Sequence, residues 1–113
     1  MQVYDAANAL AAAIRESDLC REYRHLKEEI DGNETNRALI KEYKKLQMQL
    51  QLAAVAGAAT SDEDSQRFQQ IGALLFAQPV TSQFLLSEMR VQQMMADVYK
   101  TLSDAAGLEM PGI

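Results

Sequence analysis

The sequence predicts an all-α protein of about five helices, two of them long, packed as an antiparallel helical bundle that oligomerises. Three observations support this class. The strong helix formers Ala, Leu, Met, Gln, Glu and Lys are abundant. Only two prolines and five glycines are available for turns. Apolar residues recur at alternating spacings of three and four, which is the narrow seam of helices packing nearly parallel or antiparallel.

The first two helices are expected at 3–16 and 18–30. Their seams are Val3, Ala7, Leu10 and Ile14, then Leu19, Tyr23, Leu26 and Ile30. The seam loses phase near Ser17, which suits an N-cap, and Asp31-Gly32-Asn33 ends the second helix. The N-terminal run resembles a signal-peptide core, but no cation precedes it and Asp5 and Asn8 interrupt it. We therefore interpret it as a helix.

The third helix is expected at 34–56, with Asn33 as its cap. LQMQLQL (46–52) alternates like a strand, but it contains no β-branched residue, and the seam from Leu39 runs through it without changing phase. Met48 and Leu52 lie off this seam and widen the apolar surface, as expected of a helix with more than one neighbour.

The fourth helix is expected at 62–77 and the fifth at 79–106. Ser61 and the acids that follow it resemble a capping box. Pro79 has no N–H, so it ends one helix and suits the first turn of the next. Gly107 suits a C-terminal cap.

Composition and charge restrict the function. The 113 residues fit a single domain, 1–113. The net charge of −5 argues against a general nucleic-acid binder, because affinity for phosphates rises with the cations presented to them. One cysteine excludes an internal disulfide, and the longest charge-free run, 68–87, holds too many polar residues for a membrane span. We expect a cytoplasmic location.

Two long helices in so short a chain predict uncovered seams. The third and fifth would be roughly 35–40 Å long at 1.5 Å per residue. We therefore expect a homodimer or a higher oligomer. The methionines of the last helix suit a core or an interface. The candidate oligomer or partner interface is Leu46, Leu50, Met89, Val91, Met94, Met95, Val98 and Leu102.

Four cations form a candidate docking stripe on the third helix: Arg37, Lys41, Lys44 and Lys45. One interpretation is a docking surface for an acidic partner or an RNA backbone. The other, which we favour, is the solvated face opposite the Leu39–Leu46–Leu50 seam. Glu34 and Glu42 share the segment, and no aromatic residue interleaves the cations to stack on bases.

The single cysteine and the single histidine lie close in sequence, in CREYRH. Cys20 and His25 would lie about 140° apart around a helix, so they cannot converge on one ion or substrate. Zinc needs three or four ligands, and the sequence has no further Cys or His. An intersubunit pairing is the remaining alternative. Arg21 and Arg24 would favour a thiolate if Cys20 is exposed. Because no catalytic constellation or phosphate loop is present, we predict no catalytic or metal residue.

The order of motifs resembles the YlbF/YmcA family of small helical bacterial proteins, including its YheA-like branch. The resemblance runs from Val3 to Leu108. It is carried by Tyr4-Asp5, the Glu16-Ser17 junction, Tyr23, the Tyr43…Leu46-Gln47 run, Pro79-Val80 and the final amphipathic helix. The DGNE turn lacks the proline common in the family.

The resemblance implies an all-α fold that self-associates or pairs with relatives. Family members are non-catalytic regulators linked to competence, sporulation and biofilm formation, through a complex that modulates an endoribonuclease in messenger-RNA processing. The expected function is therefore a non-catalytic adaptor. The alternatives are a structural homo-oligomer and a weak RNA-binding module that uses Arg37–Lys45. Some members carry a cysteine-bearing C-terminal extension associated with an iron–sulfur cluster. This sequence ends at Ile113 without one, so we expect no cofactor.

Overall fold

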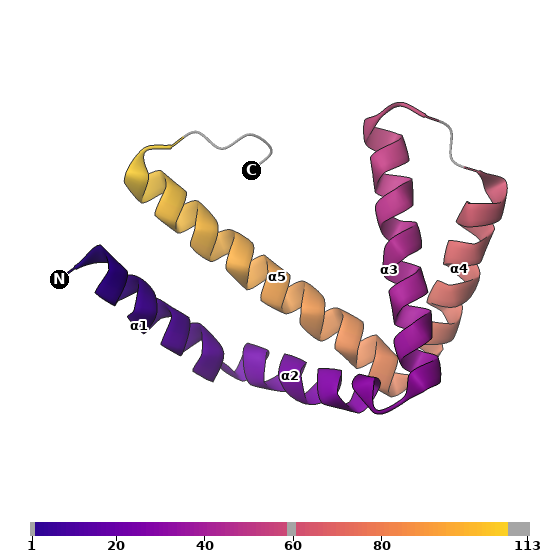
Figure 1. The fold of residues 1–113 in the computed structure, drawn as a ribbon, viewed down its shortest axis with the longest axis horizontal. Helices are drawn as coiled ribbons and strands as arrows, with labels where there is room; N and C mark the ends of the chain where they lie inside the picture. Colours follow the sequence, from indigo (N-terminus) through magenta and orange to yellow (C-terminus); the bar gives the residue numbers. More distant parts are fainter. Residues whose placement is uncertain (1, 59–60, 109–113) are drawn as a thin grey trace. The chain divides into compact units, whose positions relative to one another are not determined.

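The computed structural model describes residues 2–58 and 61–108. The described residues form five helices and no strand (Figure 1). The helices are α1 (Val3–Glu16), α2 (Asp18–Asp31), α3 (Glu34–Val55), α4 (Asp62–Ala77) and α5 (Pro79–Ala106). The all-α prediction is confirmed. The predicted bounds differ only at the C-terminal ends of α2 and α3, by one residue each.

Side-chain caps begin three of the helices where the sequence places them. The Oγ of Ser17 accepts a hydrogen bond from the backbone N–H of Cys20 at 3.3 Å. The Oδ1 of Asn33 accepts from the backbone N–H of Asn36 at 3.0 Å, and Ser61 caps α4 in the same way. Each cap satisfies an amide that has no partner within its helix, so these short polar residues define where the helices start.

Glycines with positive φ end the two long helices. Gly57 has φ 69° and Gly107 has φ 73°. Residues with a Cβ lose stability in this left-handed region of φ, whereas glycine adopts it readily. After α5, the N–H of Gly107 donates to the Asp104 carbonyl at 3.2 Å, and the N–H of Leu108 donates to the Ser103 carbonyl at 3.1 Å. The end of α3 has the same pair of bonds. Both ends are Schellman motifs, which satisfy otherwise unpaired carbonyls.

The described residues fall into two compact units. Unit 1 combines residues 2–25 with 85–108, so it holds α1, the first part of α2 and most of α5. Unit 2 is the continuous segment 26–84, which holds the end of α2, all of α3 and α4, and the first turn of α5. The expectation of one domain over 1–113 stays a prediction.

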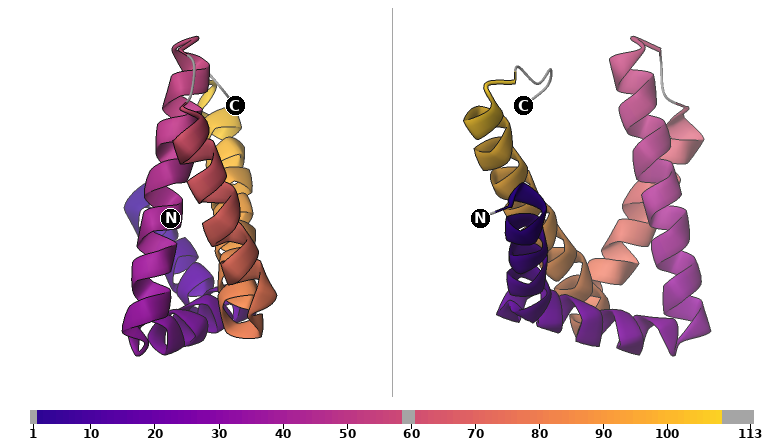
Figure 2. Two further views of the ribbon diagram at one scale, coloured as in Figure 1. Left: turned by 90° about the vertical axis from the view of Figure 1, so that its right-hand side faces the viewer. Right: turned by 60° about the vertical axis from the view of Figure 1, so that its left-hand side comes forward.

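Unit 2 is built on an antiparallel hairpin of α3 and α4, which lie side by side (Figures 1 and 2). Ile71 and Leu75 of α4 have no exposed surface, and Ile40 and Leu46 of α3 are buried. Thr81, at the start of α5, is also fully buried, and its hydroxyl donates to the carbonyl of Leu75. Apolar burial on the facing sides of α3 and α4 therefore sets which side of α3 remains exposed.

Unit 1 has a less enclosed interior. No residue of α1 is buried. Cys20 on α2 is buried, and the hydroxyl of Tyr23 donates to Glu88 Oε2 on α5 at 3.3 Å. A guanidinium nitrogen of Arg24 donates to the carbonyl of Arg15 at 2.6 Å, which joins α2 to the end of α1. The unit is thus held by a few apolar contacts and these polar links, and much of its apolar surface stays accessible.

Candidate protein-interaction surfaces

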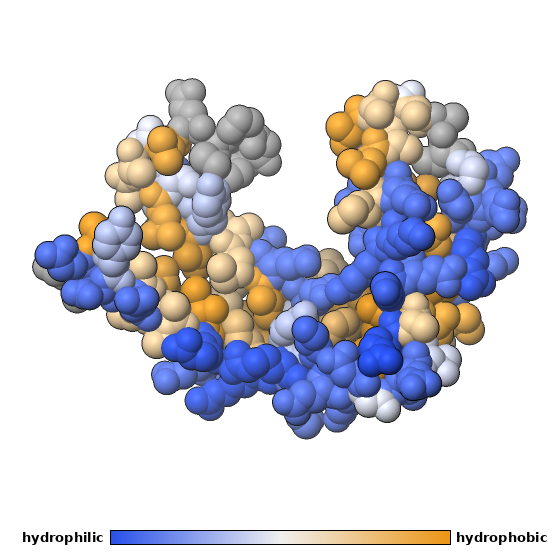
Figure 3. Space-filling view, in the orientation of Figure 1, coloured by the Kyte–Doolittle hydropathy of each residue, from blue (hydrophilic) through white to orange (hydrophobic). Residues whose placement is uncertain are grey.

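The predicted seam of α5 stays accessible in this structure. Met95 is 44% exposed and Leu102 is 53% exposed, while Val91 and Val98 are half-buried. Tyr99, beside the seam, is 47% exposed. Figure 3 shows hydrophobic surface along the region of α5. Val91, Met95, Val98 and Leu102 belong to the interface that the sequence predicts. Exposed apolar side chains at seam spacing are the surface that a partner helix can cover.

The charged residues of α5 from Arg90 to Asp104 lie on the other side of the helix from the seam. Counted at 100° per residue, they fall roughly 160–240° around the axis from Leu102. They are Arg90, Asp97, Lys100 and Asp104. Lys100 and Asp104 form an exposed ion pair of 3.8 Å along that side. The α5 seam (Val91, Met95, Val98 and Leu102) is therefore free of charge, and burying it would desolvate no ionised group.

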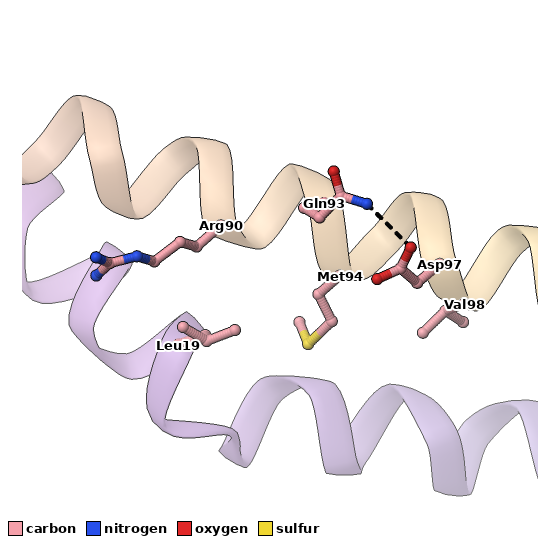
Figure 4. Close-up of a pocket in the computed structure, with 6 residues that line it drawn as sticks. All are labelled: Leu19, Arg90, Gln93, Met94, Asp97 and Val98. Carbon is pink, nitrogen blue, oxygen red and sulfur yellow. Dashed lines mark hydrogen bonds between the residues drawn. The ribbon is translucent and has the colours of Figure 1, made fainter.

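An open groove of about 410 Å³ lies beside the α5 seam within unit 1. Leu19 of α2 lines one side and residues of α5 line the other, with Met94 and Val98 pointing across it (Figure 4). Its polar lining includes Gln93, whose Nε2 donates to Asp97 Oδ1 at 3.0 Å. A mainly apolar lining with adaptable methionine suits another protein's side chain, as the sequence predicts for Met94.

One face of α3 carries the predicted basic stripe and then becomes apolar. Counted around the helix, Arg37, Lys41, Lys44 and Lys45 share a sector of roughly 100° with three apolar residues of the next turns. These are Met48, Leu52 and Val55, which are 63%, 63% and 87% exposed. Figure 3 shows hydrophilic surface along α3 and hydrophobic surface at its C-terminal end. We call these seven residues the α3 outer face.

Sequence reasoning identified both halves of the α3 outer face but missed that they are continuous. The sequence favours a solvated surface for the stripe, and it assigns Met48 and Leu52 to a separate widening of the seam. The signal was present in the spacing, since positions 37, 41, 44, 48, 52 and 55 recur every three or four residues. The burial of Leu46 on the other side of α3, together with the exposure of Met48, Leu52 and Val55, is what shows that this face points to solvent.

Glu42, the acid nearest the stripe, is engaged by α4. Arg67 Nε donates to Glu42 Oε1 at 2.9 Å, and Arg67 Nη2 donates to Glu42 Oε2 at 3.1 Å. These hydrogen bonds hold the pKa of Glu42 below its ordinary value, with a smaller contribution from the charge of Lys45. The bidentate pair directs this carboxylate towards α4, so it does not occupy the α3 outer face.

The cations of the stripe differ in how far their side chains are exposed to solvent. Lys44 Nζ lies 5.5 Å from the centroid of the Phe84 ring, a cation–π arrangement that holds this lysine partly inward. Arg37, Lys41 and Lys45 are exposed. Glu34 lies at the N-terminal end of the same face, so four cations there face one carboxylate. The N-terminal half of the α3 outer face is therefore net positive.

The other predicted interface residues are placed unequally. Met89 is 61% exposed, and Leu50 is half-buried in a small groove of about 330 Å³ that Phe68 also lines. Leu46 is only 7% exposed, so its side chain belongs to the core of unit 2 and has little surface left for a partner. The α3–α4 hairpin already covers that turn, and the expectation that Leu46 contributes to an interface stays a prediction.

The structure also decides the exposure of Cys20, which the sequence leaves open. Cys20 is a free cysteine that is 8% exposed. His25 is exposed, and among the described residues no group of three or more His, Cys, Asp or Glu side chains is arranged to hold a metal ion. None of the helices within 2–58 and 61–108 combines the length and the apolarity that a membrane crossing requires.

The fold and these surfaces define a small all-α protein with exposed helix faces. The family model described as "Control of competence regulator ComK, YlbF/YmcA" matches residues 3–105, so the chain belongs to this family. A UPF0342 protein of Halothermothrix orenii is 30% identical over 110 residues, covering 97% of this chain and 92% of its own. One from Caldicellulosiruptor saccharolyticus is 29% identical over 107 residues, covering 95% and 89%.

Two solved structures share the fold. A DUF964 protein of unknown function from Bacillus stearothermophilus matches with a TM-score of 0.75 and 19% identity, over 93% of this chain and 92% of its own. Bacillus subtilis RicA, solved in complex with RicF, matches with a TM-score of 0.61 and 20% identity, over 93% of each chain. The second of these structures thus contains this fold in a complex of two proteins.

Proposed function

We propose that this protein is a non-catalytic helical adaptor that acts through protein–protein contacts and forms homodimers through the α5 seam. The observation that carries the proposal is the exposure of Met95 and Leu102 on a face free of charge. Burying apolar surface yields about 25 cal/mol per Å². The two-fold interface of a homodimer brings the same surface of both subunits together. A stripe that is apolar and carries no charge can pack against its own copy in this way without repulsion between like charges.

The family and its structural neighbour support a regulatory role. The family description names control of a competence regulator, and the RicA structure contains a second protein, RicF. By analogy, this chain would regulate by assembling with other proteins. The process would be one of those that the resemblance implies: messenger-RNA processing by a ribonuclease complex, competence, sporulation or biofilm formation.

Two measurements test the two parts of this proposal. Light scattering on a sizing column should give a dimer or larger species at micromolar concentration, and a monomer of 12.6 kDa would contradict self-association. Crosslinking in the native host followed by recovery of the tagged chain should return a component of a ribonuclease complex. Recovery of its own subunits alone would contradict the regulatory role and favour a purely structural oligomer.

A further inference from the structure

We propose that the α3 outer face is a docking site for one amphipathic helix of a partner protein, acidic in one half and apolar in the other. This inference rests on the proposed adaptor function and assigns the partner's chemistry. The face runs from Arg37 to Val55, eighteen residues along the helix. At 1.5 Å per residue this is about 27 Å, enough to hold some five turns of a partner helix.

The apolar half calls for a protein partner. Met48, Leu52 and Val55 are between 63% and 87% exposed and follow one another at spacings of four and three. No charged residue occurs between Lys45 and Asp62, so the polar neighbours here are glutamines. A helix laid in such a stripe buries side chains at its own positions three and four apart. Because burial of a leucine-sized side chain yields about 1.5–3 kcal/mol, this half would supply affinity.

The cationic half selects the charge of that partner. Arg37, Lys41 and Lys45 are exposed, and no ion pair joins Arg37 or Lys41 to another described residue. The neighbouring carboxylate of Glu42 is held by Arg67 of α4 at 2.9 Å. Carboxylates of a partner helix would therefore find cations that this chain does not neutralise. Charge complementarity of this kind fixes register and speeds association.

A second copy of this chain fits the face less well. In an antiparallel pairing about Leu52 the apolar halves would meet, but the cations would lie beyond the paired turns and would contribute nothing. RNA also fits less well. Phosphates would use the cations but would leave Met48, Leu52 and Val55 exposed, and the α3 outer face has no aromatic side chain on which a base could stack. Both occupants are outcomes of the experiment below.

The experiment uses the full chain and two fluorescent synthetic helices of about five turns. Each has glutamates at helical spacing in one half and leucines in the other. In the first the glutamates come before the leucines, and in the second they follow, so that both parallel and antiparallel docking are sampled. We expect one of them to raise its anisotropy on binding, with an affinity that falls as salt rises. Failure of both helices to bind at about 100 µM, a concentration that detects contacts far weaker than the usual specific interface, would overturn the proposal.

Variants decide whether the α3 outer face is the site. The double variant Lys41→Glu, Lys45→Glu should weaken binding at least about tenfold, because two attractions become repulsions. Leu52→Glu should weaken it by a similar factor. Gln66→Glu is the matched control, because it adds one negative charge at an exposed position on α4, roughly 140–180° around that helix from the buried Ile71 and Leu75. It should change affinity little. Equal losses for Leu52→Glu and Gln66→Glu would show that the helix binds elsewhere.

A charge swap gives the sharpest test. A synthetic helix with lysines in place of its glutamates should bind the Lys41→Glu, Lys45→Glu variant better than it binds the unaltered chain. A folding defect cannot produce this rescue, because the variant gains binding. If the charge-reversed chain binds neither helix while keeping its helical circular dichroism, the electrostatic part of the proposal is wrong.

The remaining outcomes identify the other occupants. Tight binding of a labelled uridine oligomer that Lys41→Glu weakens and Leu52→Glu leaves unchanged would favour RNA. Loss of self-association in Leu52→Glu on the sizing column would favour a second copy. Failure of the α5-based homodimer would appear as a monomer that still binds the synthetic helix, so the two proposals fail in different assays.

Discussion

Gly72 on α4 lies directly against the ring of Tyr43 on α3. A Cβ placed on Gly72 would stand 3.3 Å from Tyr43 Cε1, closer than an ordinary contact. The ring has little freedom to retreat. It stacks on Phe68 with centroids 4.6 Å apart, and it meets the edge of Phe76 at 6.4 Å. Because the Tyr43 ring lies so close, position 72 in the middle of α4 favours glycine, which has no Cβ.

The first prediction tests this contact with a double-mutant cycle. Gly→Ala inside a helix ordinarily raises stability by about 1 kcal/mol. Here we expect Gly72→Ala to raise the free energy of unfolding by less than that, because the methyl group must displace Tyr43. In a Tyr43→Leu background the same substitution should raise the free energy of unfolding by the full amount. Urea unfolding of the four proteins measures the difference, and identical increments in both backgrounds would show that Tyr43 moves aside freely.

The second prediction concerns the α5 seam. Met95→Glu should shift the chain towards monomer on a sizing column with light scattering, because it buries an unpaired carboxylate in the proposed interface. Ala96→Glu is the matched control: it adds the same charge one residue on, about 100° away around the helix. We expect Ala96→Glu to leave the oligomeric state unchanged. If both variants stay associated, the interface lies elsewhere.

The third prediction concerns a buried hydroxyl. Ser87 is 1% exposed, and its Oγ has no hydrogen-bond partner among the described residues. Removing an unsatisfied buried polar group should be neutral or stabilising, so Ser87→Ala should raise the free energy of unfolding by up to about 1 kcal/mol. Thr81→Val gives the contrast, since the equally buried Thr81 hydroxyl bonds the Leu75 carbonyl. It should destabilise by about 1 kcal/mol. Destabilisation by Ser87→Ala would mean that its hydroxyl is satisfied.

The fourth prediction follows from the burial of Cys20. A thiol that is 8% exposed should react with a maleimide far more slowly in the native chain than in denaturant. Mass spectrometry over time measures both rates. A native rate close to the denatured rate would contradict the packing of α2 in unit 1. An intersubunit pairing of Cys20 with His25 would need this thiol to be accessible, so slow labelling also argues against that alternative.

Helix ends were predictable because their signals act within one turn. A cap such as Asn33 bonds an amide three residues away, and Pro79 restricts its own φ and removes its own N–H. Gly107 was recognisable because few other residues adopt φ 73° at low cost. The seam of α5 was predictable for a similar reason, since periodicity alone places Met95 and Leu102 on one side of a helix.

Burial was less predictable, because it depends on which elements meet. Cys20 lies one residue beyond the Leu19 seam, a position whose exposure the spacing leaves open, yet it is more buried than Leu19. Leu46 was expected at an interface, and the α3–α4 hairpin encloses it. Spacing gives the angle of a side chain around its own helix, but it does not say how wide a sector the neighbouring helix covers.

Local signals in the chain specify the all-α class, the ends of the helices and the apolar seams. These are local properties, set by backbone hydrogen bonding and by a period of 3.6 residues. Packing between helices, in contrast, places Gly72 against Tyr43 and pairs Arg67 with Glu42. It also leaves exposed the face that Lys41 and Leu52 share by their spacing. These relations arise because α4 packs on the opposite side of α3 and brings residues far apart in the chain into contact.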